Sequence, residues 1–236
     1  MGWLADTVAW LLDGANWTGS DGVLTLLGQH LLLTLVALVA ACLISLPLAI
    51  WLGHIGRGGV LAVQLTNMGR AVPVLAVLVV LVVAGSPFGF SGLTPVTAFT
   101  LFAIPPIVTN TYVGMREVDR GAVEAARGMG MTGWQLVRRV ELPLAAPLIL
   151  NGIRLSATQL VATVSIAALV AFGGLGRVIT LGFANQDVGQ VVAGALLIAL
   201  LALVVEALFD VLGRLVDPGR RMAASTGRVP VVSREP

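Results

Sequence analysis

Long apolar runs constrain this sequence more than any other feature. A bilayer has a hydrocarbon core about 30 Å thick, so a helix needs roughly 20 mostly apolar residues to cross it. Five runs approach or exceed that length, at residues 27–52, 60–84, 93–115, 145–172 and 191–212. Their apolar residues are continuous instead of alternating with polar ones, which favours helices over a β-barrel. We therefore predict an all-α, polytopic membrane helix bundle with about five transmembrane helices.

The basic residues and the cysteine count exclude two kinds of site. All 14 basic residues are arginines, because the sequence contains no lysine. A Walker-type P-loop needs a lysine on the nucleotide phosphates, so this chain cannot supply such an ATP site itself. The single cysteine, Cys42, excludes an intrachain disulfide and a cysteine-cluster metal site. We expect no cofactor or metal on this chain, and no nucleic acid partner.

The arginines are distributed unevenly about the apolar runs. Arg57 follows the first run, five arginines lie within residues 116–139 and five lie within residues 214–234, whereas Arg177 alone falls on the opposite side. Cytoplasmic loops of membrane proteins carry an excess of basic residues. This distribution predicts that the loop after the third run and the C-terminus are cytoplasmic, with the N-terminus outside.

The two ends of the chain differ from the apolar middle, which we assign to a transmembrane domain at residues 23–217. Residues 1–22 contain three tryptophans and no basic residue, so they form an external lead-in and not a cleavable signal peptide. Either a short interfacial helix or a loosely ordered segment fits this composition. Residues 218–236 are polar and carry arginine and proline, which predicts a flexible cytoplasmic tail.

The segment between the third and fourth runs, residues 116–143, is too rich in helix signals for a simple linker. These signals are Asp119, Gly128, Gly130, Thr132 and Gln135. The aspartate is placed to cap a first helix, and the two glycines end it. Thr132 and Gln135 have the spacing of a capping box at the start of a second helix. We expect a helix-turn-helix in which Leu142, before Pro143, leaves helical geometry.

The first of these helices has a small, smooth face formed by Ala122, Ala125, Ala126 and Met129. On the same helix, Glu124 has the spacing to pair with Arg120 or Arg127. Small side chains permit the close approach of a partner. The alternative is that the segment only caps its own helix bundle.

The spacing within this segment is specific. It reads Glu124-Ala125-Ala126, three residues, Gly130, nine residues, Val140, one residue and then Leu142-Pro143. This pattern resembles the EAA signature of bacterial binding-protein-dependent ABC importers, whose usual form has isoleucine where this chain has Val140. The resemblance implies a permease subunit of the cytoplasmic (inner) membrane, with a transmembrane fold like that of methionine importers. It also makes residues 116–143 the coupling loop, which seats in a cleft on an ATPase subunit.

The resemblance implies a role for each signature residue in ATPase coupling. Glu124 would orient the first helix through charge-assisted hydrogen bonds, while Ala125 and Ala126 would allow close seating. Gly130 would permit the turn. The remaining signature residues are Val140, Leu142 and Pro143. The implied partners are an ABC ATPase dimer that binds ATP and Mg, an extracytoplasmic substrate-binding protein, and a second permease copy or a paralogue in the bilayer.

Four further segments resemble the osmoprotectant branch of this family, which imports glycine betaine, carnitine or choline. They are residues 67–73, 104–112, 151–154 and 173–176. The family usually has an arginine before the asparagine of the third span, whereas this chain has Thr109. Permeases for methionine and other amino acids share the coupling loop, so they remain the alternative.

Polar groups and prolines within the apolar runs mark a candidate translocation path, which comprises Arg70, Pro73, Pro105, Pro106, Asn110 and Tyr112. Prolines at 47, 105 and 106 are expected to break their helices, and broken helices in a membrane line a cavity or pack tightly on a neighbour. Arg70 lines the path or lies near the headgroups. The glycines Gly173, Gly174 and Gly176 form either a gate or a turn.

A rival hypothesis is a channel or proton-coupled carrier driven by Glu206, Asp210 and Arg70. It leaves the coupling loop unexplained, and the sequence shows no convincing inverted repeat. The spacing of Glu206, Asp210 and Arg214 instead favours an ion-pair ladder. The histidines His30 and His54 stand apart from any nucleophile or ligand set, so we expect them to be packed or solvated. The chain is therefore not expected to be an enzyme.

Overall fold

The structure is a computed structural model that describes residues 2–59, 63–64 and 72–216. Its elements are α1 (Gly2–Leu12), η1 (Gly14–Trp17), α2 (Val23–Ile55), α4 (Val74–Ala84), α5 (Leu93–Arg116), α6 (Arg120–Gly128), α7 (Gly133–Leu136), the π-helical segment η2 (Val137–Glu141), α8 (Leu142–Val164), η3 (Ser165–Val170), α9 (Gly176–Ala184) and α10 (Val188–Val216). Every regular element in the described residues is helical, which confirms the all-α prediction.

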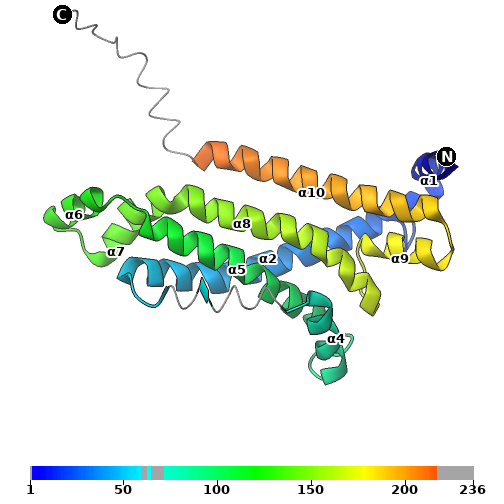
Figure 1. Ribbon diagram of the computed structural model, residues 1–236, viewed down its shortest axis with the longest axis horizontal. Coiled ribbons are helices and arrows are strands. Elements are labelled where there is room, and N and C mark those ends of the chain that lie inside the picture. Colours follow the sequence, from blue (N-terminus) through cyan, green and yellow to red (C-terminus); the bar gives the residue numbers. More distant parts are fainter. Residues whose placement is uncertain (1, 60–62, 65–71, 217–236) are drawn as a thin grey trace, which may run out of the picture.

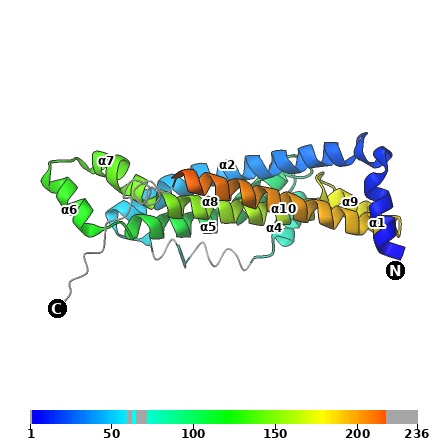
Figure 2. The same ribbon diagram turned by 90° about the horizontal axis from the view of Figure 1, so that it is seen from above.

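The long helices α2, α5, α8 and α10 run side by side along the molecule (Figures 1 and 2). In chain order α2 packs on α5, α5 on α8, and α8 on α10. The coupling-loop helices α6 and α7 lie at one end of this bundle, and α1 and α9 lie at the other. The bundle thus separates the coupling loop from the glycines at 173–176 by the full length of the long helices.

Four helical stretches are long and apolar enough to cross a membrane, among them the continuous stretch Gly133–Val170. The second predicted span is the exception. Apart from the helical residues 63–64, its described part forms only α4, which is too short to cross a bilayer alone. Residues 60–62 and 65–71, including the candidate path residue Arg70, lie outside the described residues, as does the predicted tail at 218–236.

Small residues set the distance between the long helices. Ala37 and Ala41 of α2 are fully buried, and Ala98 and Ala103 of α5 are nearly so, all in one cluster around Phe99. Gly114 of α5 leaves no room for a side chain, because an added Cβ would lie 2.9 Å from Leu148 and 3.2 Å from the Ala145 carbonyl. Small residues at such contacts let helix backbones approach closely in lipid, where apolar burial alone does not drive association.

The prediction that Pro47, Pro105 and Pro106 break their helices was wrong. Both α2 and α5 continue through these residues. The lost backbone donors are tolerated because α5 is packed between α2 and α8, with Pro105 and Pro106 buried. The Ser156 hydroxyl of α8 also donates a 2.8 Å hydrogen bond to the Ala103 carbonyl, which ties α8 to the same region of α5.

The N-terminal lead-in, for which a helix and a loosely ordered segment were both possible, contains the helix α1. Figure 2 shows α1 crossing the end of α10. Gly189 of α10 permits this contact, because a Cβ there would lie 2.9 Å from Asp6. The following turn is held by Asp13, whose carboxylate accepts a 2.9 Å hydrogen bond from the Ala15 amide, and by the Trp17 indole, which donates to the Leu11 carbonyl at 2.8 Å.

Candidate functional site

The first helix of the coupling loop begins and ends at the predicted residues. The Asp119 carboxylate accepts a 2.8 Å hydrogen bond from the Ala122 amide at the start of α6. The helix closes at Gly128, and Gly130 takes a left-handed backbone with φ of 79°. The Met131 amide then donates to the Ala126 carbonyl at 3.2 Å. A side chain at residue 130 would strain this turn, which is why the turn favours glycine.

The second helix carries the predicted capping box. The Thr132 amide donates to the Gln135 side chain at 2.9 Å, and the Gln135 amide donates to the Thr132 hydroxyl at 3.4 Å. These reciprocal bonds satisfy backbone donors that the first turn of a helix otherwise leaves open. The local signals alone therefore define where α7 begins.

The expected break at Leu142 was wrong, because Leu142 has helical backbone angles of −62° and −46°. Its amide bonds back to the Val137 carbonyl, five residues earlier, and residues Val137–Glu141 form a π-helical turn. Pro143 consequently falls in the first turn of α8, where a missing amide donor is tolerated. The coupling loop thus passes into α8 without a hinge at the proline, through a π turn of the kind often found at functional sites.

The signature residues do not share one surface. Glu124 and Ala125 are exposed, but Ala126 is only 2% exposed and packs within the chain. The predicted pairing of Glu124 with Arg120 or Arg127 does not form in the part of the chain described by the structure. Val140 and Leu142 are half-buried and Pro143 is exposed. The outward surface therefore consists of Glu124, Ala125 and their exposed neighbours.

Sequence reasoning missed a contact between the coupling loop and α2. The Nδ1 atom of His54 lies 2.7 Å from a carboxylate oxygen of Glu141, whose side chain is 7% exposed. A carboxylate accepts, so the imidazole donates this bond. Glu141 stands between two signature residues, Val140 and Leu142. Its position in the signature was visible, but nothing in the sequence pointed to a partner 87 residues away.

The candidate path residues in the described part of the chain lie in four different settings. Pro105 and Pro106 are buried in α5, so they do not line an open path within this chain. Tyr112 of α5 packs its ring on Gly59, just past the end of α2, so closely that a Cβ added to Gly59 would overlap the ring. Pro73 is an exposed N-cap of α4. Asn110 is the one that meets another intramembrane polar group.

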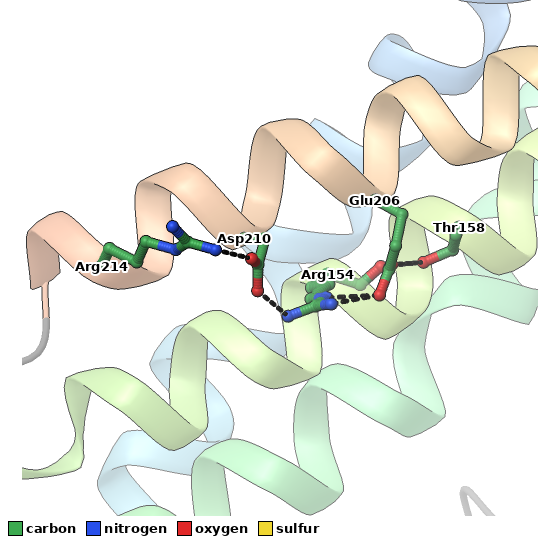
Figure 3. A network of polar contacts seen from close by, with 5 residues as sticks. All are labelled: Arg154, Thr158, Glu206, Asp210 and Arg214. Carbon is green, nitrogen blue, oxygen red and sulfur yellow. Dashed lines mark hydrogen bonds and ion pairs between the residues drawn. The ribbon is translucent and has the colours of Figure 1, made fainter.

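Asn110 joins a band of polar groups that crosses α5, α8 and α10. Its side-chain oxygen accepts a 3.2 Å hydrogen bond from Asn151. One turn further along α8, Arg154 donates to Glu206 at 2.8 Å through Nε and to Asp210 at 3.3 Å (Figure 3). We call Asn110, Asn151, Arg154, Glu206 and Asp210 the polar strip. Of the ion-pair ladder predicted on α10, Arg214 and Asp210 pair at 2.8 Å, and Arg154 of α8 joins Asp210 to Glu206.

The polar strip is incompletely covered by this chain. The side chains of Arg154, Glu206 and Asp210 are 31%, 40% and 47% exposed. Glu206 lies ten residues before the end of α10 at Val216, about 15 Å along the axis, which places it well inside the apolar stretch. Charged groups at that depth are costly unless they face protein or water. The strip therefore requires either another protein surface or an aqueous path against it.

The glycine loop, residues 173–176, is held on α2 by two neighbouring side chains. The Gly174 amide donates to the side-chain oxygen Oε1 of Gln29 at 3.1 Å, and the Leu175 amide donates to Nδ1 of His30 at 3.2 Å. His30 is fully buried, and its Nε2 lies 2.9 Å from the Val161 carbonyl. Since a carbonyl only accepts, Nε2 carries the proton and Nδ1 is the acceptor.

The glycines of this loop are required by close packing. A Cβ at Gly173 would overlap the Gln29 side chain, and one at Gly176 would overlap the backbone of Ser165. Gly174 has φ of 97°, which disfavours any other residue. Beside the loop is a cavity of about 480 Å³, bordered by the exposed ion pair between Asp21 and Arg177 at 2.6 Å. These contacts fix the backbone of the glycine loop against α2 and η3.

Known proteins similar to this chain include permease proteins of transport systems. The family model described as "Binding-protein-dependent transport system inner membrane component" matches residues 41–222. The chain is 31% identical over 191 residues to the glycine betaine/carnitine/choline transport system permease protein OpuCB of Bacillus subtilis, covering 81% of this chain and 87% of OpuCB. It is 36% identical over 195 residues to the osmoprotectant import permease protein OsmY of Salmonella typhimurium, covering 81% of each chain.

The fold is also found among solved structures. An inward-facing crystal structure of the MetNI methionine ABC transporter contains a chain that superposes with a TM-score of 0.70 at 24% identity, covering 83% of this chain and 96% of that one. At this identity the likeness concerns the fold alone. The family match and the four membrane-length helices make the chain a multi-pass inner membrane protein, and its family works with ATPase and substrate-binding partners. The chain belongs to the family of binding-protein-dependent transport system inner membrane components, the permease subunits of ABC importers.

Proposed function

We propose that this permease imports a small osmoprotectant, with glycine betaine, carnitine and choline as the candidate substrates. The observation that carries the proposal is the coupling loop, a capped helix-turn-helix at one end of the bundle with Glu124 and Ala125 exposed. Relatives named for these substrates support the substrate class. The methionine transporter supports only the fold, because it is below 25% identity.

In this proposal the coupling loop docks on an ATPase subunit in the cytoplasm, and the N-terminus lies outside. Glu124 is exposed without an ion pair among the described residues, which leaves its carboxylate free to accept hydrogen bonds from a partner. Ala125 beside it is small enough for close seating. Ala126, Val140 and Leu142 act from within the chain by holding the loop to the bundle, Gly130 shapes the turn, and Pro143 begins α8.

A second permease copy or a paralogue faces the polar strip in this proposal. The support is the partial exposure of the three charged side chains at membrane depth, together with Asn151, which is exposed in this chain. Two such strips facing one another would enclose a polar path for a small zwitterion or cation. The glycine loop stands at the other end of the bundle, where it serves as the outer gate of that path.

The experiment is ATP-driven uptake in vesicles that contain the permease, its ATPase and its substrate-binding protein. Labelled glycine betaine should accumulate, and excess choline or carnitine should compete more strongly than methionine. Glu124→Gln should reduce both uptake and substrate-stimulated ATP hydrolysis. Glu117→Gln changes another exposed carboxylate of the coupling loop and should leave both near wild type.

The outcomes separate the remaining alternatives. Uptake of methionine with no effect of glycine betaine would reject the substrate class but retain the importer. Uptake that follows a proton gradient without ATP would favour the secondary carrier. Full ATP-coupled uptake by the Glu124→Gln variant would reject the proposed role of that carboxylate.

A further inference from the structure

A groove runs along α2 at the end of the bundle that bears the coupling loop. It has a volume of about 550 Å³ and lies between Trp51 of α2 and Trp134 of α7. Its remaining walls are almost wholly apolar and include Leu46, Pro47, Ile50, Val137 and Leu142. Trp51 is 59% exposed and Trp134 is 70% exposed, so two large aromatic side chains flank the opening. We call this hollow the α2–α7 groove.

The groove does not end within the loop, because a second hollow continues it along α2. That hollow has a volume of about 440 Å³, shares Leu46 and Pro47 with the groove, and extends to Leu38. Trp51 and Leu38 are 13 residues apart, about 20 Å along the helix, which is about half of a bilayer roughly 40–45 Å thick with its headgroup regions. The two hollows together form an apolar track of the length of one lipid leaflet.

The position of Trp51 places the mouth of this track at the membrane surface. Val23 and Trp51 are 28 residues apart in α2, about 42 Å, which matches a bilayer with its headgroup regions. Trp17 precedes the other end of α2. Tryptophans commonly lie at both membrane interfaces, because their rings are apolar and their N–H groups are polar.

Two arginines adjoin the mouth of the groove. Arg138 and Arg139 are exposed on η2, and they share a hollow of about 370 Å³ with Trp134 and Gln135. Neither arginine forms an ion pair within the described residues. The nearest acid in the same segment, Glu141, is buried against His54. The mouth thus presents two guanidinium groups, which attract and hydrogen-bond phosphate.

We propose that the α2–α7 groove binds an anionic phospholipid, with an acyl chain along α2 and the phosphate on Arg138 and Arg139. The apolar track favours a lipid over a protein partner, since the hollow at residues 38–47 lies along α2 away from the coupling loop, out of reach of a subunit docked on that loop. The proposal rests on the proposed function in one respect only, which is that the bound lipid belongs to the cytoplasmic leaflet. Its test measures lipid binding, so it does not depend on coupling to an ATPase.

The test is quenching of tryptophan fluorescence by brominated phospholipids in phosphatidylcholine vesicles. Replacing Trp3, Trp10 and Trp17 with phenylalanine leaves Trp51 and Trp134 as the reporters, because the chain has 5 tryptophans. Brominated phosphatidylglycerol should reach half-maximal quenching at a mole fraction roughly fivefold or more below that of brominated phosphatidylcholine. Arg138→Gln with Arg139→Gln should remove this preference.

Two matched variants keep the result interpretable. Arg120→Gln with Arg127→Gln removes two exposed arginines from α6 of the same loop and should retain the preference. Arg138→Lys with Arg139→Lys keeps the charge and should retain most of it, which separates charge from loss of folding. Equal quenching by the two lipids in the parent protein would overturn the proposal. Relief of the quenching by the added ATPase subunit would do so as well, because the groove would then be a subunit interface.

Discussion

His54 near the C-terminal end of α2 donates a 2.7 Å hydrogen bond to Glu141 in the π turn that joins the coupling loop to α8. The contact is supported on both sides. Gly133 of α7 lies against the same imidazole, and Gly53 of α2 packs so closely on Met115 of α5 that a side chain would not fit. A displacement of the coupling loop would therefore be transmitted to α2 as well as to α8.

We predict that His54→Ala loosens the attachment of α2 to the coupling loop. It leaves the buried Glu141 carboxylate without its partner, which costs about 1–3 kcal/mol. The thermal stability of the purified permease should fall, and substrate-stimulated ATP hydrolysis of the assembled importer should fall with it. Glu141→Gln should be milder, since the amide oxygen still accepts the hydrogen bond. Wild-type stability in His54→Ala would show that the contact is not formed.

We predict that His30→Leu speeds the hydrogen exchange of backbone amides in the glycine loop. The change leaves the buried Leu175 amide without its acceptor, at about 1–3 kcal/mol, and removes the His30 hydrogen bond to the Val161 carbonyl. Hydrogen exchange at residues 174 and 175 should accelerate. Gln29→Leu removes only the bond to the Gly174 amide and should have the smaller effect. Unchanged exchange at Leu175 in His30→Leu would contradict the account.

Glycine substitutions should differ in severity according to what the new Cβ meets. Gly176→Ala places it into the backbone of Ser165, which cannot move without shifting η3, so folding or insertion should be lost. Gly173→Ala meets the flexible end of Gln29 and should be tolerated better. Gly28→Ala in α2 meets nothing within 4 Å and should be neutral or stabilising. Membrane yield and thermal stability of the three variants should follow this order.

Removing one charge of the ion pair between Arg154 of α8 and Glu206 of α10 should lower the membrane yield more than removing both charges. Arg154→Gln leaves Glu206 with only the Thr158 hydroxyl as a partner, and Glu206→Gln leaves Arg154 with Asp210 alone. The double variant has no unmatched charge at that pair, so its membrane yield should recover relative to the single variants. Its transport rate should stay low if the strip lines the path. Additive losses in yield would contradict direct pairing.

Local chemistry accounts for what was predictable from the sequence. Asp119, Gly130 and the Thr132–Gln135 pair act within a few residues of themselves, so the boundaries of α6 and the start of α7 were predicted correctly. The apolar runs likewise predicted α5 and α10, because span length is set by bilayer thickness.

The failures involve interactions between distant segments. Pro105 and Pro106 do not break α5, because the neighbouring helices hold it in place. The partners His54 and Glu141 are 87 residues apart, and Arg154 and Glu206 are 52 apart, so neither contact had a local signal. Ala126 is buried in a loop whose α6 packs on α7 and η2, and the helical spacing of the alanines did not reveal these contacts.

The central claim, that the exposed face of α6 seats on an ATPase subunit, is tested most directly by thiol crosslinking. The single cysteine makes a clean background possible through Cys42→Ala. A bifunctional thiol–amine reagent on Ala125→Cys should link the permease to its ATPase, whereas Ser91→Cys at the opposite end of α5 should give no such product. A crosslink to the ATPase from residue 91 and none from residue 125 would contradict the account.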